Sequence, residues 1–187
     1  MEIEKKNRFT EFVKSYGLYL IVGVMVFALA LTFALMATLN RTTQTGGGML
    51  HFELPMADAI VIKDFSDTEL QNNETLNQWE AHLSVDLASD SSAVYAILDG
   101  TVASVDYSFL DGYSITLNHA NGFVSIYSSL NEDVLVKEGD KVQAGDKIGE
   151  ASDSASGELD LGSHLCLTMK LNNNYVDPNN YLNLQEK

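Results

Sequence analysis

The chain has 187 residues, of which 11 are basic and 26 acidic, for a net charge of −15. Residues 40–187 carry 7 basic and 23 acidic side chains, a net charge of −16. Because nucleic-acid affinity rests on basic side chains that displace counterions from phosphates, this charge excludes nucleic-acid binding. The single cysteine, Cys166, excludes an internal disulfide, and the length allows one domain with an appendage or two small domains.

The N-terminal region contains an uninterrupted apolar segment, residues 17–39, with no charged side chain. As a helix its 23 residues would span roughly 35 Å, enough to cross a bilayer core. Four basic residues precede the segment and only Arg41 closely follows it, which predicts a cytoplasmic tail over residues 1–16 and an extracytoplasmic remainder. A cleaved signal peptide normally has a shorter apolar region, of about 7–15 residues. We therefore expect an uncleaved single-pass anchor.

Residues 40–80 connect the apolar segment to the rest of the chain. Residues 40–50 are polar and contain three consecutive glycines, a composition typical of a flexible tether. Within residues 51–80 we expect a leading strand after Pro55. We also expect a short helix over residues 67–80, the one soluble helix that the sequence favours.

From Ala81 onward, apolar and polar residues alternate and turn residues recur about every ten positions, which is typical of short β-strands. Asn121-Gly122 is a strong hairpin signal because both residues tolerate a positive φ. The repeat V-x-x-G-D-x-V within residues 134–149 places Gly-Asp turns between apolar residues that can enter a core. The expected strands are residues 94–97, 101–105, 113–117, 123–127 and 165–171.

These elements predict an all-β domain over residues 81–187, a compact barrel-like sandwich of short antiparallel strands preceded by one transmembrane helix. The spacing shows no doubly wound α/β pattern. The Gly-Asp repeat also occurs in lipoyl-type hairpins of carrier domains. Carriers need a lysine at a tight turn near the repeat, whereas Lys170 lies within an alternating strand, so the carrier interpretation is disfavoured.

Four residues in two short motifs could take part in chemistry at a metal ion. His82 and Asp86 stand four positions apart, about 13 Å on a straight strand, so the chain must bend between them if both bind one ion. His164 and Cys166 stand two positions apart on one face of a predicted strand, about 7 Å from each other. Imidazole, carboxylate and thiolate could form a three-ligand zinc site with an open position. The same spacing fits structural roles: a turn-capping Asp86, a solvated His82 and a small buried Cys166.

Five motifs follow one another along residues 80–182: HLSVD, VYAILDGTV, LNHANGFVSIYSSL, VKEGDKVQAGDKIGE and LGSHLCLTMKLNNNYVDPNNYL. In this order they resemble the lysostaphin/LytM-type zinc endopeptidase domain, whose pattern includes H-x-G-x-D, Y-A-H-L, H-L-H-F-E and V-D-P. With the N-terminal anchor and the segment ELPMADAIVIKDF, the chain also resembles LytM-type proteins of the forespore membrane in endospore-forming bacteria. The resemblance implies a LytM-type fold for residues 81–187.

The resemblance also implies roles for individual positions. His82 and Asp86 match two zinc ligands, and Cys166 stands where the third ligand, a histidine, is expected. His164 matches one catalytic histidine, which would orient or deprotonate a zinc-bound water. Ser129 stands where the second catalytic histidine is expected. Zinc is therefore the cofactor that the resemblance implies.

The departures from the family pattern argue against efficient hydrolysis. Loss of one general acid or base, as at Ser129, typically lowers the rate by about 10²–10⁴. Cys166 in place of a histidine would add a negative charge and make zinc a weaker Lewis acid. Ser84 replaces the glycine of H-x-G-x-D, where the chain must bend. We expect a catalytically degenerate domain in which a retained zinc ion could brace the fold; the alternative is an active zinc-dependent peptidoglycan endopeptidase.

The resemblance further implies a docking role in sporulation. The partner would be a mother-cell membrane protein like stage III sporulation protein AH, which would meet the forespore protein across the intermembrane space in a channel-like complex. The resemblance also leaves room for a ring oligomer and for contact with peptidoglycan. It places the anchor in the forespore membrane, with the C-terminal domain outside the cytoplasm.

Overall fold

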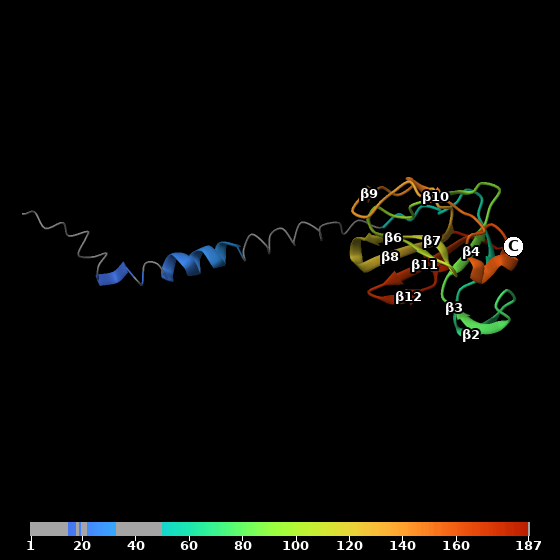
Figure 1. Ribbon diagram of the computed structural model, residues 1–187, viewed down its shortest axis with the longest axis horizontal. Helices are drawn as coiled ribbons and strands as arrows, with labels where there is room; N and C mark the ends of the chain where they lie inside the picture. The colour runs from blue at the N-terminus through green and yellow to red at the C-terminus, as the bar shows by residue number, and fades with distance from the viewer. Residues whose placement is uncertain (1–14, 18, 20–21, 33–49, 187) are drawn as a thin grey trace, which may run out of the picture. The chain divides into compact units, whose positions relative to one another are not determined.

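The computed structural model describes residues 15–17, 19, 22–32 and 50–186 (Figure 1). The chain divides into two units, Met1–Gly46 and Gly47–Lys187. Most of the expected cytoplasmic tail and nearly all of the expected tether lie outside the described residues. The boundaries expected for the tail, anchor, tether and domain stay predictions.

The first unit contains a helix, Ser15–Thr32, that is long and apolar enough to cross a membrane. Its 18 residues correspond to about 27 Å at the usual helical rise, and its described side chains are mostly exposed. This helix is what a single-pass membrane protein requires. Residues 33–39 of the expected anchor lie outside the described residues.

The second unit is built from short β-strands, as expected. The described strands are β1 (Ile60–Lys63), β2 (Ser66–Asn73), β3 (Gln78–His82), β4 (Val85–Ala88), β5 (Ala93–Tyr95), β6 (Gly100–Ser108), β7 (Gly112–His119), β8 (Phe123–Leu130), β9 (Lys141–Val142), β10 (Lys147–Glu150), β11 (Leu165–Leu171), β12 (Asn174–Val176) and β13 (Gln185–Glu186). Three short 3₁₀ helices complete it: η1 (Ala120–Gly122), η2 (Ser156–Leu161) and η3 (Pro178–Asn180). The strands expected from residue 94 onward all have counterparts, and the leading strand is β1.

The main sheet has nine strands in the order β13-β1-β4-β11-β8-β7-β6-β9, with β12 paired to β11 (Figure 1). The pairs β5–β10 and β2–β3 form two smaller sheets. The main order has two ends, so the arrangement is a sandwich and not a closed barrel. The described pairings are antiparallel except for β1 with β13, which run parallel. The all-β expectation is confirmed, with β4 and β11 as neighbours in the interior of the sheet.

Both Gly-Asp dipeptides of the repeat form the turns that the sequence predicts. Gly139 and Gly145 have φ values of 88° and 84°, a region that side chains rarely adopt. The carboxylate of Asp140 accepts a hydrogen bond from the Lys137 amide at 3.1 Å, and that of Asp146 accepts one from Gln143 at 2.7 Å. Glycine therefore supplies the backbone conformation and aspartate closes each turn.

The helix expected over residues 67–80 is wrong: the segment forms the β2–β3 hairpin. Leu70 and Trp79 are exposed, so the segment has no apolar face that a helix could bury. The buried Asn73 side chain closes the hairpin instead. Its amide donates to Glu80 Oε1 at 2.8 Å and to the Gly157 carbonyl at 3.0 Å, which also ties the hairpin to η2.

In the core, a buried tyrosine hydroxyl accepts a hydrogen bond from a buried backbone amide. The Tyr127 ring is buried, its hydroxyl accepts a hydrogen bond from the Ile97 amide at 2.9 Å, and it is hydrogen-bonded to Ser125 Oγ at 3.2 Å. Burial raises the pKa of Tyr127 to about 12. The hydroxyl thus stays protonated while it satisfies an amide that no water reaches.

Replacing Tyr127 with phenylalanine should lower the free energy of unfolding by about 1–3 kcal/mol, because the Ile97 amide would be left buried without an acceptor. Tyr107→Phe is the matched control, since Tyr107 is 60% exposed. Denaturant unfolding measures both changes. Equal stability of the two variants would contradict the role given to the Tyr127 hydroxyl.

Residues 44–187 should fold as a soluble domain without the apolar segment, because the described core runs from Met56 to Leu182 within the second unit. Circular dichroism should show one cooperative thermal transition. An insoluble fragment, or one that melts without cooperativity, would show that the domain boundary is misplaced.

Candidate metal centre

The site lies where the end of β3, the start of β4, the start of β11 and η2 meet. His82 is the last residue of β3 and Asp86 is the second residue of β4. The chain bends at Ser84 between them, so the two side chains approach to 3.1 Å (His82 Nε2 to Asp86 Oδ2). The bend required by the four-residue spacing is therefore present, at the serine that replaces the family glycine.

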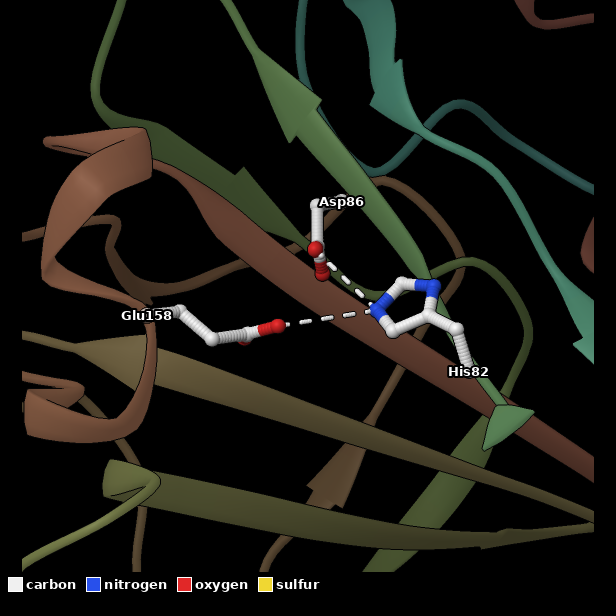
Figure 2. A group of neighbouring side chains, drawn as sticks. All are labelled: His82, Asp86 and Glu158. Atoms are coloured by element: carbon white, nitrogen blue, oxygen red, sulfur yellow. Dashed lines mark ion pairs between the residues drawn. The ribbon is translucent and has the colours of Figure 1, made fainter. Parts of the chain in front are cut away.

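The backbone fixes the orientation of the His82 ring. A carbonyl oxygen can only accept, so Nδ1–H of His82 donates to the Asp64 carbonyl at 2.8 Å. This leaves Nε2 directed at Asp86 Oδ2, at Glu158 Oε1 3.7 Å away and at Ser84 Oγ 3.1 Å away (Figure 2). Burial lowers the pKa of His82, but the carboxylates of Asp86 and Glu158 raise it to about 9. Without a metal ion, the ring therefore carries a proton at neutral pH.

Asp86 is the most deeply buried charged group of the site. Its side chain is 0% exposed, and no hydrogen-bond donor among the described residues is aligned on either carboxylate oxygen. A buried carboxylate without aligned donors strongly favours a nearby positive charge. Among the described residues, His82 is the one cationic group that forms an ion pair with it.

Glu158, on η2, completes the site and was not predicted from the sequence. One oxygen, Oε1, lies 2.9 Å from Lys63 Nζ; the other, Oε2, lies 3.5 Å from His164 Nε2. Burial raises the pKa of Glu158, but His164, His82 and Lys63 hold it well below its ordinary value. The residue belongs to an irregular segment 76 positions from His82, and no pattern in the sequence links the two.

The His164 ring is oriented in the same way as that of His82. Its Nδ1–H donates to the Gly162 carbonyl at 2.8 Å, and no hydrogen bond is aligned on the buried Nε2. Burial lowers the pKa of His164, but Glu158 raises it above its ordinary value. His164 therefore faces the same carboxylate as His82, from the opposite oxygen.

Cys166 lines the same cleft as His82 and Glu158, whereas Ser129 is bonded to the backbone. Cys166, in β11, pairs in register with Asp86, but its sulfur is outside the cluster of donor atoms. Burial raises the pKa of the Cys166 thiol well above its ordinary value, and the charges of Asp86 and Glu158 add to this. Ser129 is buried, and its hydroxyl donates to the Ser152 carbonyl at 2.8 Å. Its proton is therefore already committed to the backbone.

The donor atoms of His82, Asp86 and Glu158 fit a divalent metal ion. All three lie within 4.8 Å of one another, and Figure 2 shows the side chains converging from separate segments. Zinc bonds of about 2.0–2.2 Å place neighbouring tetrahedral donors about 3.4 Å apart, close to the 3.1 and 3.7 Å separations measured from His82 Nε2. His82 and Glu158 also line an open cleft of about 370 Å³.

Comparison with known proteins finds a family whose model matches the sequence, and solved structures that share the fold. Peptidase family M23 matches residues 80–178. Stage II sporulation protein Q of Bacillus subtilis (strain 168) is 28% identical over 156 residues, which cover 76% of this chain and 54% of that protein. The chain therefore spans about half the length of this curated relative.

Two solved structures are similar over most of the second unit. A chain from the structure of the SpoIIQ–SpoIIIAH pore-forming complex is 25% identical, with a TM-score of 0.64, over 72% of this chain and 92% of that one. A zinc-containing peptidase from Vibrio cholerae is 25% identical, with a TM-score of 0.59, over 69% of this chain and 39% of that one.

His82→Ala should weaken zinc binding by about tenfold or more, because it removes the donor that faces both carboxylates. Ser129→Ala should leave the zinc affinity unchanged, because the Ser129 hydroxyl is directed at a backbone carbonyl. Competition with a chromophoric chelator measures both variants. Equal zinc affinity in the wild type and His82→Ala, including no binding by either, would exclude His82 as a ligand.

Proposed function

The chain belongs to peptidase family M23, and from this premise we propose that it is a membrane-anchored sporulation protein whose external domain docks to a second membrane protein. The observation that carries the proposal is the structural match to a chain solved within the SpoIIQ–SpoIIIAH complex, over 92% of that chain. The similarity to stage II sporulation protein Q points to the same process.

The partner that this proposal implies is a SpoIIIAH-like protein of the mother-cell membrane. The apolar helix would anchor the chain in the forespore membrane, and the basic residues before it favour an N-terminus in the cytoplasm. The second unit would then face the intermembrane space as the forespore side of a channel-like complex. A ring of several copies is compatible with such a complex.

The site supports docking over efficient hydrolysis. Ser129 occupies the position of a catalytic histidine, and a buried hydroxyl bonded to the Ser152 carbonyl cannot replace an imidazole as general base. Without a metal ion, burial and the charges of Asp86 and Glu158 raise the pKa of the Cys166 thiol well above its ordinary value. Zinc bound by His82, Asp86 and a third donor would polarise a peptide carbonyl and activate water. The residues that would move protons around it are incomplete.

The charge of the external region fits a protein partner better than a membrane surface. Residues 40–187 carry a net charge of −16, which repels anionic lipid headgroups within a Debye length. A partner with compensating basic residues would associate faster at low salt. The acidic surface thus favours an encounter with a protein over adsorption to a bilayer.

One observation favours the alternative, a zinc-dependent peptidoglycan endopeptidase. The three donors of His82, Asp86 and Glu158 lie within 4.8 Å of one another, and His164 Nε2 faces the same carboxylate. A metal ion and one catalytic histidine could therefore support slow hydrolysis. A zymogram against purified peptidoglycan separates this alternative from docking.

Binding to the external domain of SpoIIIAH should be retained, within about twofold, in His164→Ala and in chelator-treated protein, because docking uses the surface and not the buried site. The association rate should fall as salt rises from about 50 to about 500 mM. Surface-immobilised full-length protein and soluble SpoIIIAH domain measure both effects. If no form binds SpoIIIAH and only the wild type clears a peptidoglycan zymogram, the endopeptidase function replaces the docking function.

A further inference from the structure

Lys63 places a positive charge inside the candidate metal centre. It is the last residue of β1 and lies opposite Asp86 of β4 in the sheet register. Its side chain is only 11% exposed, and its Nζ donates to Glu158 Oε1 at 2.9 Å. None of the five ordered motifs includes this residue, because it lies in the segment ELPMADAIVIKDF that precedes them.

The oxygen that Lys63 contacts is the same oxygen that faces His82. Glu158 Oε1 lies 2.9 Å from Lys63 Nζ and 3.7 Å from His82 Nε2. A metal ion bound at that oxygen, with a bond of about 2.1 Å, would lie within about 5 Å of the ammonium nitrogen. Repulsion between two cations at this distance is strong where little water screens them. Full metal binding and an intact Lys63–Glu158 pair therefore oppose each other.

We propose that Lys63 is a built-in cation of this site, which holds Glu158 in place and competes with a divalent metal ion for its carboxylate. This inference concerns the buried site and does not rest on the docking function. The Lys63 ammonium explains how a cluster of acidic groups that could bind zinc is stabilised without a bound ion. Asp86 and Glu158 together carry two negative charges, and Lys63 balances one of them without any bound ion.

Removing this charge should tighten metal binding. Lys63→Met in the full-length protein should bind cobalt(II) or zinc(II) at least about tenfold more tightly than the wild type, the size of effect that one neighbouring charge has on a carboxylate. Lys63→Arg keeps the charge and should bind like the wild type. Lys147→Met is the matched control, because Lys147 forms a similar pair with Glu150 at 2.7 Å on an exposed surface. It should leave metal affinity unchanged.

Glu158→Gln in the Lys63→Met background tests whether the gain depends on the shared carboxylate. The double variant should lose the gain, because the amide is a poor ligand for zinc. Metal affinity in Lys63→Met that equals or falls below that of the wild type would overturn the proposal. So would a gain that persists in the double variant.

The wild-type protein gives a second measurement, in case Lys63→Met fails to fold. Reductive methylation followed by mass spectrometry should modify Lys63 more slowly than Lys147, whose side chain is 38% exposed. Zinc at millimolar concentration should bind and should speed modification of Lys63, because the ammonium then leaves Glu158. Stoichiometric zinc binding with an unchanged Lys63 rate would contradict the proposal.

Discussion

A carboxylate buried without aligned donors is the constraint around which this domain is organised. Asp86 is 0% exposed, and burial of such a charge is costly unless cations lie nearby. Three strands meet that requirement: β4 carries Asp86, β1 places Lys63 opposite it, and β3, from a separate sheet, brings the His82 ring to 3.1 Å. Although burial lowers the pKa of His82, the attraction between its ring and the carboxylates of Asp86 and Glu158 raises that pKa to about 9. The strand register therefore determines which cations lie near the buried carboxylate.

The domain keeps the fold of family M23, whereas its candidate site differs from the pattern expected for the family. The donor atoms of two expected ligands, His82 and Asp86, lie close together, and Glu158 of η2 lies beside them. Ser129, expected at the position of a catalytic histidine, has its hydroxyl bonded to a backbone carbonyl. A domain of this kind keeps a rigid sheet and an acidic exterior, which suit recognition of a partner. Under the proposed function, that exterior meets the partner and the buried cluster takes no direct part in docking.

The sequence predicts those parts of the fold in which side chains alternate between core and solvent. In β11 (Leu165–Leu171) the expected alternation is present, and the strand is confirmed. The β2–β3 hairpin escaped prediction because it faces no core: Trp79 is exposed, so apolar spacing carries no information there. The roles of Glu158 and Lys63 also escaped prediction, because neither stands in one of the five ordered motifs. They meet His82 only through the folding of an irregular segment and a leading strand.

The central claim is that the cations of the chain itself stabilise the buried Asp86 carboxylate without a metal ion. The most direct test is the melting temperature of the full-length protein in a chelator and with one equivalent of zinc. The account predicts that the two temperatures agree within about 2 °C. A rise of about 10 °C or more with zinc would contradict it, because stabilisation of that size requires tight binding to the folded state.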